Sequence, residues 1–203
     1  YHEIFLGGGS VLFALLSLQK EGKVEIKGEI YAYDLNESLI NIYKNIQSNR
    51  EKLFEYIEKY WKEYDEITGN EINRKPETLK DAKTSKESYY YWVRNSFNKM
   101  NKSSIEHSAI FIFLNKTCFR GLYREGPNGF NVPYGHYKKT PSMITKEELY
   151  NISELIKNVI FKCCDFDVSL SNVSKGDLMY LDPPYAPENS KSFVGYTTDG
   201  FSI

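Results

Sequence analysis

The start of the chain repeats one pattern, a short apolar run followed by a helix. Residues 1–6 are rich in apolar side chains, a run of glycines at 7–9 follows, and apolar side chains then recur at helical spacing up to residue 22, with Ser10 as the expected N-cap. Residues 29–49 repeat the same order of strand and helix. Strands that alternate with helices favour a parallel sheet with crossover helices, so we expect an α/β fold.

The pattern changes in the middle of the chain. We expect a charged amphipathic helix at residues 51–67, a polar surface loop at 68–88 and a second helix at 89–100. An apolar segment at 107–117 and a glycine- and aromatic-rich segment at 118–139 follow. A helix with Thr145 as its N-cap and strands at 159–166 and 177–185 then restore the first pattern. We therefore predict a sheet domain made of residues 1–50 and 141–203, and an insertion made of residues 51–140.

Composition narrows the class of protein. The 26 Lys and Arg residues balance 27 Asp and Glu residues, so a surface for nucleic acid has to be a local patch. The three cysteines lack metal-ligand spacing, and we expect buried thiols in a reducing cytoplasm. The apolar run from Val11 to Leu18 is too short to cross a membrane.

Unusual residues follow the expected strands. Gly7 and Gly9 allow a ligand to approach the backbone, and Asp34 ends the second strand, where a carboxylate accepts hydrogen bonds from ribose hydroxyls. Together they suggest an adenosine cofactor, although a nicotinamide enzyme shares this pattern. Asp165 and Phe166 follow a third strand, and there a contact with adenine and a simple turn cap are equally good interpretations.

The fourth strand end carries Asp182, Pro183, Pro184 and Tyr185, directly after an expected buried strand at residues 178–181. The exocyclic amine of adenine is a poor nucleophile because its lone pair is delocalised into the ring. A carboxylate from Asp182 and a fixed carbonyl from Pro183 would each accept one of its hydrogens, and Tyr185 would stack on the base. This sequence therefore predicts methylation of an amino group on a base, and a Pro-Pro turn that only ends the strand is the alternative.

The chain resembles the DNA adenine-N6 methyltransferases of the Dam type, the alpha-ordered D12 class that includes restriction-modification enzymes. The likeness rests on "HEIFLGGGS", "YAYDLNESLINIY", "CCDF" and "LDPPYAP" with the following "SFVGYTTDGF". It implies a Rossmann-like sheet with helices on both faces, no metal, and a monomer that acts on double-stranded DNA in the cytoplasm. It also implies S-adenosylmethionine as the cofactor, bound by Glu3, Phe5, Gly7, Gly9, Asp34, Asp165, Phe166 and Asp182.

Two departures from this family are visible. Ile4 stands where relatives commonly have proline. The family's leading segment, which contains lysine and glycine, has no counterpart in the chain, and neither do its last strands. We therefore expect flanking segments on both sides.

The insertion has the residues that a DNA reader needs. Lys116, Arg120, Arg124, Lys138 and Lys139 oppose a single acid, Glu125. By resemblance to the family's target-recognition hairpin, we expect a mainly helical insertion with a β-hairpin, in which Phe119 wedges between base pairs beside Leu122 and Arg124 reads guanine. Asn131, Pro133 and Tyr134 would shape the same loop. Packing of this hairpin on its own domain is the alternative.

Other functions stay open at this stage. A nicotinamide dehydrogenase would not explain the sequence at residues 182–185. Cytosine-N4 methyltransferases more often carry serine at the position of Asp182, and protein-glutamine methyltransferases carry asparagine there. A non-catalytic DNA-binding relative is a further alternative. Arg120 stands where relatives often have asparagine, so the target is predicted only as a short palindrome with adenine, for example GATC or CATG.

Overall fold

The computed structural model describes residues 1–184 of the chain. These residues form two compact units. Unit 1 consists of residues 1–50 and 145–183, and the described part of unit 2 consists mainly of residues 51–144. The structural division thus assigns residues 141–144 to unit 2.

Unit 1 is built on a parallel sheet of four strands in the order β5-β2-β1-β6. These are β1 (His2–Glu3), β2 (Ile30–Asp34), β5 (Val159–Cys163) and β6 (Met179–Tyr180). In the centre, Glu3 lies between Ala32 of β2 and Tyr180 of β6. The expected α/β architecture is therefore confirmed.

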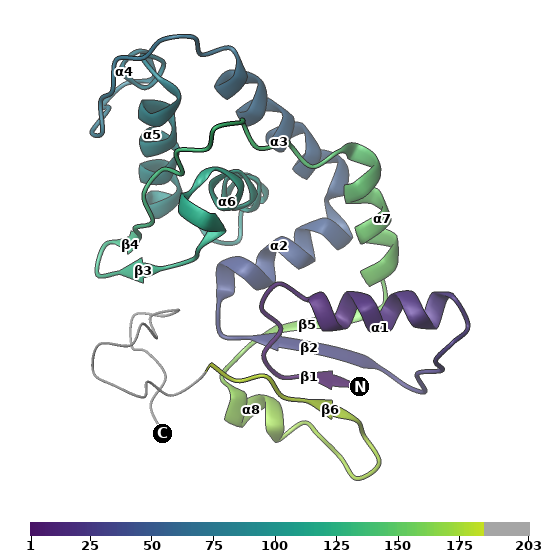
Figure 1. The fold of residues 1–203 in the computed structure, drawn as a ribbon. Coiled ribbons are helices and arrows are strands. Elements are labelled where there is room, and N and C mark those ends of the chain that lie inside the picture. The colour runs from purple at the N-terminus through teal and green to yellow at the C-terminus, as the bar shows by residue number, and fades with distance from the viewer. Residues whose placement is uncertain (185–203) are drawn as a thin grey trace. The chain divides into compact units, whose positions relative to one another are not determined.

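Helices cover both faces of this sheet (Figure 1). One face carries α1 (Ser10–Lys20), α2 (Glu37–Ser48) and α7 (Lys146–Ile156), and α7 packs against both other helices. The other face carries α8 (Phe166–Leu170). Leu12, Ile40, Leu149 and Ile156 are fully buried between the helices and the sheet. Burial of these side chains supplies the main driving force for this packing.

Two helix starts test the capping predictions. The Thr145 side chain accepts from the backbone of Glu148, whose carboxylate bonds back to Thr145, so the predicted N-cap of α7 is confirmed. The prediction for α1 is wrong, because its N-cap is Gly9 and no side chain caps the helix. Gly9 has φ +70°, a conformation that glycine adopts at little cost and serine does not.

The expectation of a buried strand at residues 178–181 is also wrong. Leu178 is 66% exposed and Leu181 is 47% exposed, and only Met179–Tyr180 is strand. In the described residues β6 pairs only with β1, so it is an edge strand and its apolar side chains are not enclosed. The expectation that all cysteines are buried is wrong as well, because Cys163 is exposed at the end of β5.

Unit 2 is mainly helical. Its elements are α3 (Arg50–Asp65), α4 (Leu79–Ala82), α5 (Lys86–Lys99), α6 (Ile105–Thr117), the 3-10 turn η1 (Phe119–Gly121), β3 (Glu125–Gly126) and β4 (Gly129–Phe130). The apolar segment expected at 107–117 forms α6, which is buried on most sides. Around Phe113 of α6 pack the rings of Tyr60, Trp61, Tyr64 and Tyr89.

The polar loop expected at residues 68–88 contains regular structure. A capping box between Thr78 and Asp81 starts the short helix α4, and α5 begins at Lys86 with Ser85 as its N-cap. Local side-chain to backbone hydrogen bonds, rather than an apolar pattern, define these helix starts. No described helix is both long and apolar enough to cross a membrane.

Candidate functional site

The carboxyl ends of the four strands of unit 1 lie at one edge of the sheet, because all the strands are parallel. After β1 the chain runs to β2 and later to β5, and it then returns to β6 on the other side of β1. The strand order therefore reverses between β1 and β6, and ligands of open α/β sheets bind at such a point. The segments that follow β1 and β6 carry the glycine loop and Asp182.

Asp34, at the end of β2, holds the glycine loop. Its Oδ2 accepts from the backbone N–H of Gly7 at 2.9 Å, and its Oδ1 accepts from the N–H of Asn36 at 2.8 Å. Burial raises the pKa of Asp34, and the N–H groups of Asn36 and Gly7 oppose this rise. Each carboxylate oxygen has a second lone pair, so Asp34 can still accept from the hydroxyls of a ribose.

Tyr43 of α2 contacts the same loop. Its hydroxyl donates to the carbonyl of Gly7 at 3.0 Å, and its ring stacks on Phe161 of β5 with centroids 4.9 Å apart. Burial, followed by the charges of Asp34 and Glu3, raises the pKa of Tyr43, so its hydroxyl stays a hydrogen-bond donor.

Tyr43 also explains why glycine is needed in the loop. A Cβ on Gly9 would lie 2.9 Å from the Tyr43 hydroxyl. Sequence reasoning did not identify Tyr43 as a site residue. The available signal was a tyrosine on a buried helix face, whose hydroxyl needs a partner.

Glu3 is 2% exposed in unit 1. Its Oε2 accepts from the Tyr1 hydroxyl at 2.8 Å, and the backbone of Leu12 near the start of α1 also bonds to the carboxylate. Burial raises the pKa of Glu3, while the Tyr1 hydroxyl and the Leu12 backbone lower it. The predicted cofactor contact of Glu3 stays a prediction, and in this structure its partners are protein groups.

Phe5 and Phe166 come together beyond the ends of β1 and β5. Their rings are stacked with centroids 6.0 Å apart, and Phe166 is 41% exposed. Asp165 is the N-cap of α8 and its side chain accepts from the N–H of Phe166 at 2.6 Å. The turn-capping arrangement is thus present, while the exposed carboxylate and the rings provide an acceptor and a flat apolar surface.

Asp182 follows β6 by two residues and is exposed, as is Pro183. The register of β1 and β6 pairs Glu3 with Tyr180, and the N–H of Ile4 donates to the carbonyl of Tyr180 at 3.2 Å. Asp182 therefore continues the strand beside the segment that leads from β1 into the glycine loop. The Tyr185 prediction lies outside the described residues.

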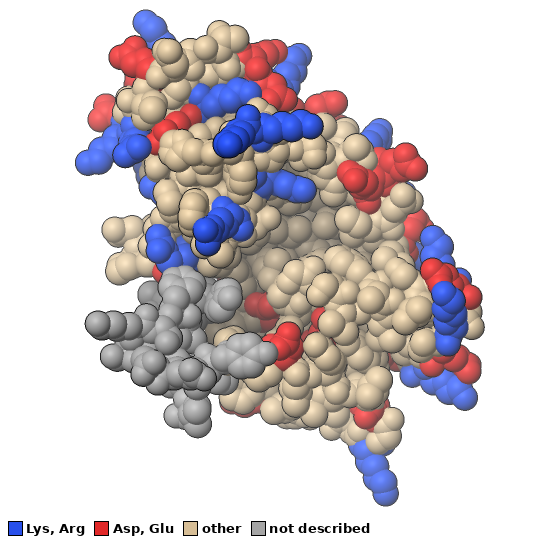
Figure 2. Space-filling view, in the orientation of Figure 1, with Lys and Arg blue, Asp and Glu red and all other residues tan. Residues whose placement is uncertain are grey.

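The predicted DNA-binding residues all lie in unit 2. Figure 2 shows Lys and Arg side chains over α5, α6 and the β3-β4 hairpin. In the hairpin, Arg124 Nε donates to Asn131 Oδ1 at 2.6 Å, and Arg124 Nη2 lies 3.4 Å from the Asn131 carbonyl. These contacts orient the guanidinium and leave its other donors available.

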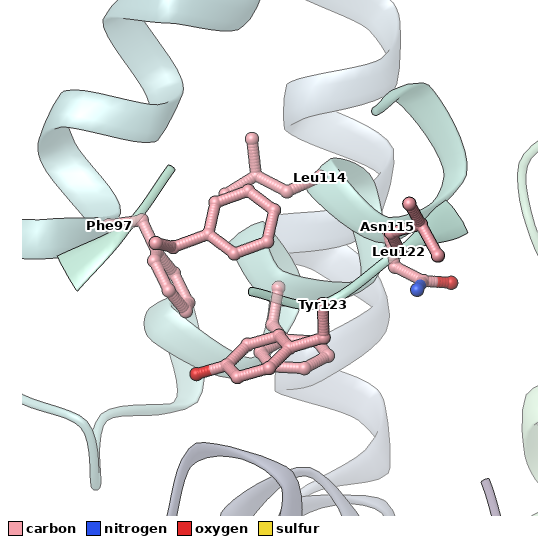
Figure 3. Close-up of a pocket in the computed structure, with 7 residues that line it drawn as sticks. Phe97, Leu114, Asn115, Leu122 and Tyr123 are labelled. Carbon is pink, nitrogen blue, oxygen red and sulfur yellow. The ribbon is translucent and has the colours of Figure 1, made fainter. Parts of the chain in front are cut away.

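The turn before the hairpin presents apolar side chains. Phe119 is 44% exposed and Leu122 is 43% exposed, and Arg120, with φ +57°, lies over the Phe119 ring at 5.1 Å. Leu122 and Tyr123 also line a small apolar pocket of unit 2 (Figure 3). The other lining residues are Phe97, Phe111, Leu114, Asn115 and Phe130.

The remaining predicted residues surround this turn. Lys116 is exposed at the end of α6, and the carbonyl of Pro133 accepts from the N–H of Phe119 at 2.9 Å. Tyr134 is half-buried, and its hydroxyl lies 2.6 Å from the hydroxyl of Tyr64. Pro133 and Tyr134 therefore support the turn from within unit 2. Among the described residues, no group of three or more His, Cys, Asp or Glu side chains is arranged to hold a metal.

The chain is similar in sequence to known proteins. The chain is 40% identical over its full length to the type II methyltransferase M.MjaIII of Methanocaldococcus jannaschii, and 33% identical over its full length to the type II methyltransferase M1.LlaDCHI of Lactococcus lactis subsp. cremoris. It is 29% identical over 99% of its length to the DNA adenine methylase of Serratia marcescens. The chain spans 64%, 62% and 63% of these relatives, respectively. The family model described as D12 class N6 adenine-specific DNA methyltransferase matches residues 1–203, and the chain therefore belongs to this family.

Proposed function

We propose that the protein to which this chain belongs is an S-adenosylmethionine-dependent DNA methyltransferase that acts on the N6 amine of adenine within a short duplex sequence. The observation that supports this most strongly is the parallel sheet of unit 1, which gathers the glycine loop, Asp34, Asp165 and Asp182 at one edge. Family membership and the names of the relatives support the same activity.

The residues at this edge suit an adenosine cofactor. A Cβ on Gly7 or Gly8 would meet no heavy atom within 4 Å, so the backbone there is open to a ligand. Asp34 offers carboxylate oxygens to ribose hydroxyls, and the Phe5 and Phe166 rings offer apolar faces to a purine. When bound, S-adenosylmethionine supplies an electrophilic methyl group.

Asp182 and Pro183 prepare the amine of the target base. The carboxylate of Asp182 accepts one N–H of the amine and the carbonyl of Pro183 accepts the other, which increases the availability of the nitrogen lone pair. With the cofactor bound, the nitrogen would take the methyl group from the sulfonium, S-adenosylhomocysteine would leave, and the proton released from the amine would pass to water. Because Asp182 is exposed at a strand end, an extrahelical base can reach it.

Unit 2 would supply the contacts with DNA. A base inside a duplex cannot enter an active site, so it has to be flipped out and the gap filled. The exposed Phe119 and Leu122 are suited to that gap, and Arg124 is suited to guanine in the major groove. Both sets of groups come from one chain, so the proposed reaction needs no second subunit.

The test uses the purified full-length protein with plasmid DNA and S-adenosylmethionine labelled in the methyl group. We expect label in DNA, and sequencing of the product to find N6-methyladenine within one short motif. Methylation of cytosine at N4 would favour the cytosine-specific alternative, and DNA binding without any transfer would favour a non-catalytic relative. Sedimentation of the active protein checks that it is a monomer.

A further inference from the structure

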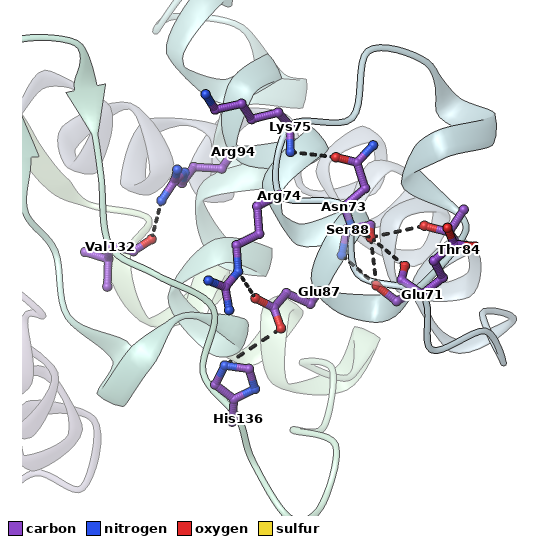
Figure 4. Close-up of polar contacts among 11 residues, drawn as sticks. Glu71, Asn73, Arg74, Lys75, Thr84, Glu87, Ser88, Arg94, Val132 and His136 are labelled. Atoms are coloured by element: carbon purple, nitrogen blue, oxygen red, sulfur yellow. Dashed lines mark hydrogen bonds and ion pairs between the residues drawn. The ribbon is translucent and has the colours of Figure 1, made fainter.

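Three side chains on one face of α5 bond to the backbone of the strand that leaves the hairpin. Asn98 donates through Nδ2 to the carbonyl of Phe130 at 3.0 Å and accepts through Oδ1 from its N–H at 2.9 Å. The carbonyl of Val132 accepts from the Tyr90 hydroxyl at 2.8 Å. It also accepts from Arg94 Nη1 at 2.9 Å (Figure 4). Residues spaced by four along a helix lie on one face, so these side chains form a row.

This row replaces a neighbouring strand. In the hairpin, the N–H of Asn131 donates to the carbonyl of Arg124, so the polar groups of Phe130 and Val132 point away from β3. Those groups would normally bond to another strand or to water. Here the amide of Asn98 bonds to both groups of Phe130, as a strand would.

The row extends one turn toward the start of α5. Glu87 Oε2 lies 3.8 Å from His136 Nε2, and Glu87 Oε1 accepts from Arg74 Nε at 2.8 Å (Figure 4). Phe130, Val132 and His136 follow one another along the chain and contact Asn98, then Tyr90 and Arg94, then Glu87. Segment 130–136 therefore runs antiparallel to α5.

The hairpin is also shaped to accept Asn98. Gly129 has φ +89°, and a Cβ there would lie 2.6 Å from Asn98 Oδ1. Phe130 and Val132 are 4% and 2% exposed, so their side chains are anchored as well as their backbones. Between them, Asn131 is exposed and bonds to Arg124.

From these contacts we infer that Tyr90, Arg94 and Asn98 are positioning residues that fix the orientation of Arg124 and thereby set its discrimination between base pairs. The inference rests on the proposed function, in which Arg124 reads a base. α5 holds the backbone on both sides of Asn131, and Asn131 holds the guanidinium of Arg124. A guanidinium that is already oriented loses less entropy on binding and rejects a wrong base more strongly.

The test compares Asn98→Ala with Asn95→Ala in the full-length protein. Asn95 lies on the same helix and is also exposed, so both variants change helix propensity equally. Hydrogen exchange of the Phe130 amide measures the contact itself. Mapping of methylated adenines in plasmid DNA measures discrimination, as the ratio of methylation at the preferred motif to methylation at sites that differ by one base pair.

We expect Asn98→Ala to speed exchange at Phe130 by about tenfold and to lower the discrimination ratio by about tenfold at one base pair. Asn95→Ala should change neither. Asn98→Asp keeps the acceptor for the Phe130 N–H but loses the donor. Its exchange rate and discrimination ratio should lie between those of Asn98→Ala and those of the unchanged protein. A partial rescue of this kind would not follow from general destabilisation.

Other outcomes would overturn the inference. Unchanged exchange at Phe130 in Asn98→Ala would show that the contact does not hold the strand. Faster exchange with an equal loss of methylation on all sequences would rule out a role in discrimination. If the unchanged protein methylates no adenine, the proposed function itself fails, and the role in discrimination fails with it. The exchange measurement would then still decide whether α5 holds the strand.

Discussion

The hydroxyl of Tyr43 donates a hydrogen bond to the carbonyl of Gly7 at 3.0 Å. Asp34 binds the N–H of the same residue at 2.9 Å, so both polar backbone groups of Gly7 are held by side chains from β2 and α2. Protein groups alone therefore hold the glycine loop in this shape. Such preorganisation lowers the entropic cost of binding.

Removal of the Tyr43 hydroxyl should weaken cofactor binding. The Tyr43→Phe variant keeps the ring that stacks on Phe161 and loses one hydrogen bond worth about 1 kcal/mol, so we expect the dissociation constant for S-adenosylmethionine to rise about fivefold. Equilibrium binding measures this change. Tyr90→Phe, which also removes a bond from a tyrosine hydroxyl to a backbone carbonyl, should leave the constant unchanged. Equal effects of the two variants would contradict a specific role of Tyr43.

Asp182→Ala should abolish methyl transfer while DNA binding persists. The exposed side chain contributes little to stability, whereas loss of an aligned acceptor in the transition state costs at least about a hundredfold in rate. Single-turnover transfer and DNA binding are measured on the same preparation. The control is Asp167→Ala, which removes a different exposed acid, in the segment after β5, and this variant should keep its activity. Normal turnover by Asp182→Ala would remove this residue from the catalytic site.

Arg124→Ala should relax sequence preference at one base pair by about 1 to 3 kcal/mol. The expected cause is the loss of a guanidinium that Asn131 orients toward a base edge. Lys139→Ala, which removes an exposed cation, should instead weaken binding to all sequences alike. Competition binding with a set of duplexes separates the two patterns. A uniform loss in Arg124→Ala would assign Arg124 to the phosphate backbone.

His107 should make the protein less stable as the pH falls. Burial, together with the charge of Lys102, lowers the pKa of His107 to about 4, whereas an unfolded histidine titrates near 6.5. The unfolded state therefore binds a proton first, and stability present above about pH 6.5 is lost progressively down to about pH 4. Between about pH 7.5 and about pH 5, we expect His107 to account for a loss of about 2 kcal/mol.

His107→Phe tests this assignment. Phenylalanine can keep the stack on Phe97, where the ring centroids are 4.1 Å apart, and it does not titrate. Urea unfolding at several pH values should show a flatter dependence in the variant. An unchanged slope would assign the acid sensitivity to other groups.

Much of the candidate site could be predicted from local sequence. The glycines before α1, Asp34 at the end of β2 and Asp182 after β6 were placed at strand ends, because apolar runs and turn residues mark those ends along the chain. The character of the insertion was predictable for a similar reason, since charged helical patterns and a basic aromatic segment are local features. Local capping at Thr145 was also predictable, whereas the N-cap of α1 was not, because the backbone conformation of Gly9 decides it.

The contacts that position these residues depend on the tertiary structure. The strand order places β6 beside β1 although most of the chain separates them, and no local pattern encodes that neighbour. Tyr43 meets Gly7 across 36 residues, and Asn98 meets Phe130 across 32. The sequence by itself determined which chemical groups this protein carries at its strand ends and in its hairpin. Only the tertiary structure decided which of these groups are held and by what, because burial and hydrogen bonding between distant segments arise when the chain packs.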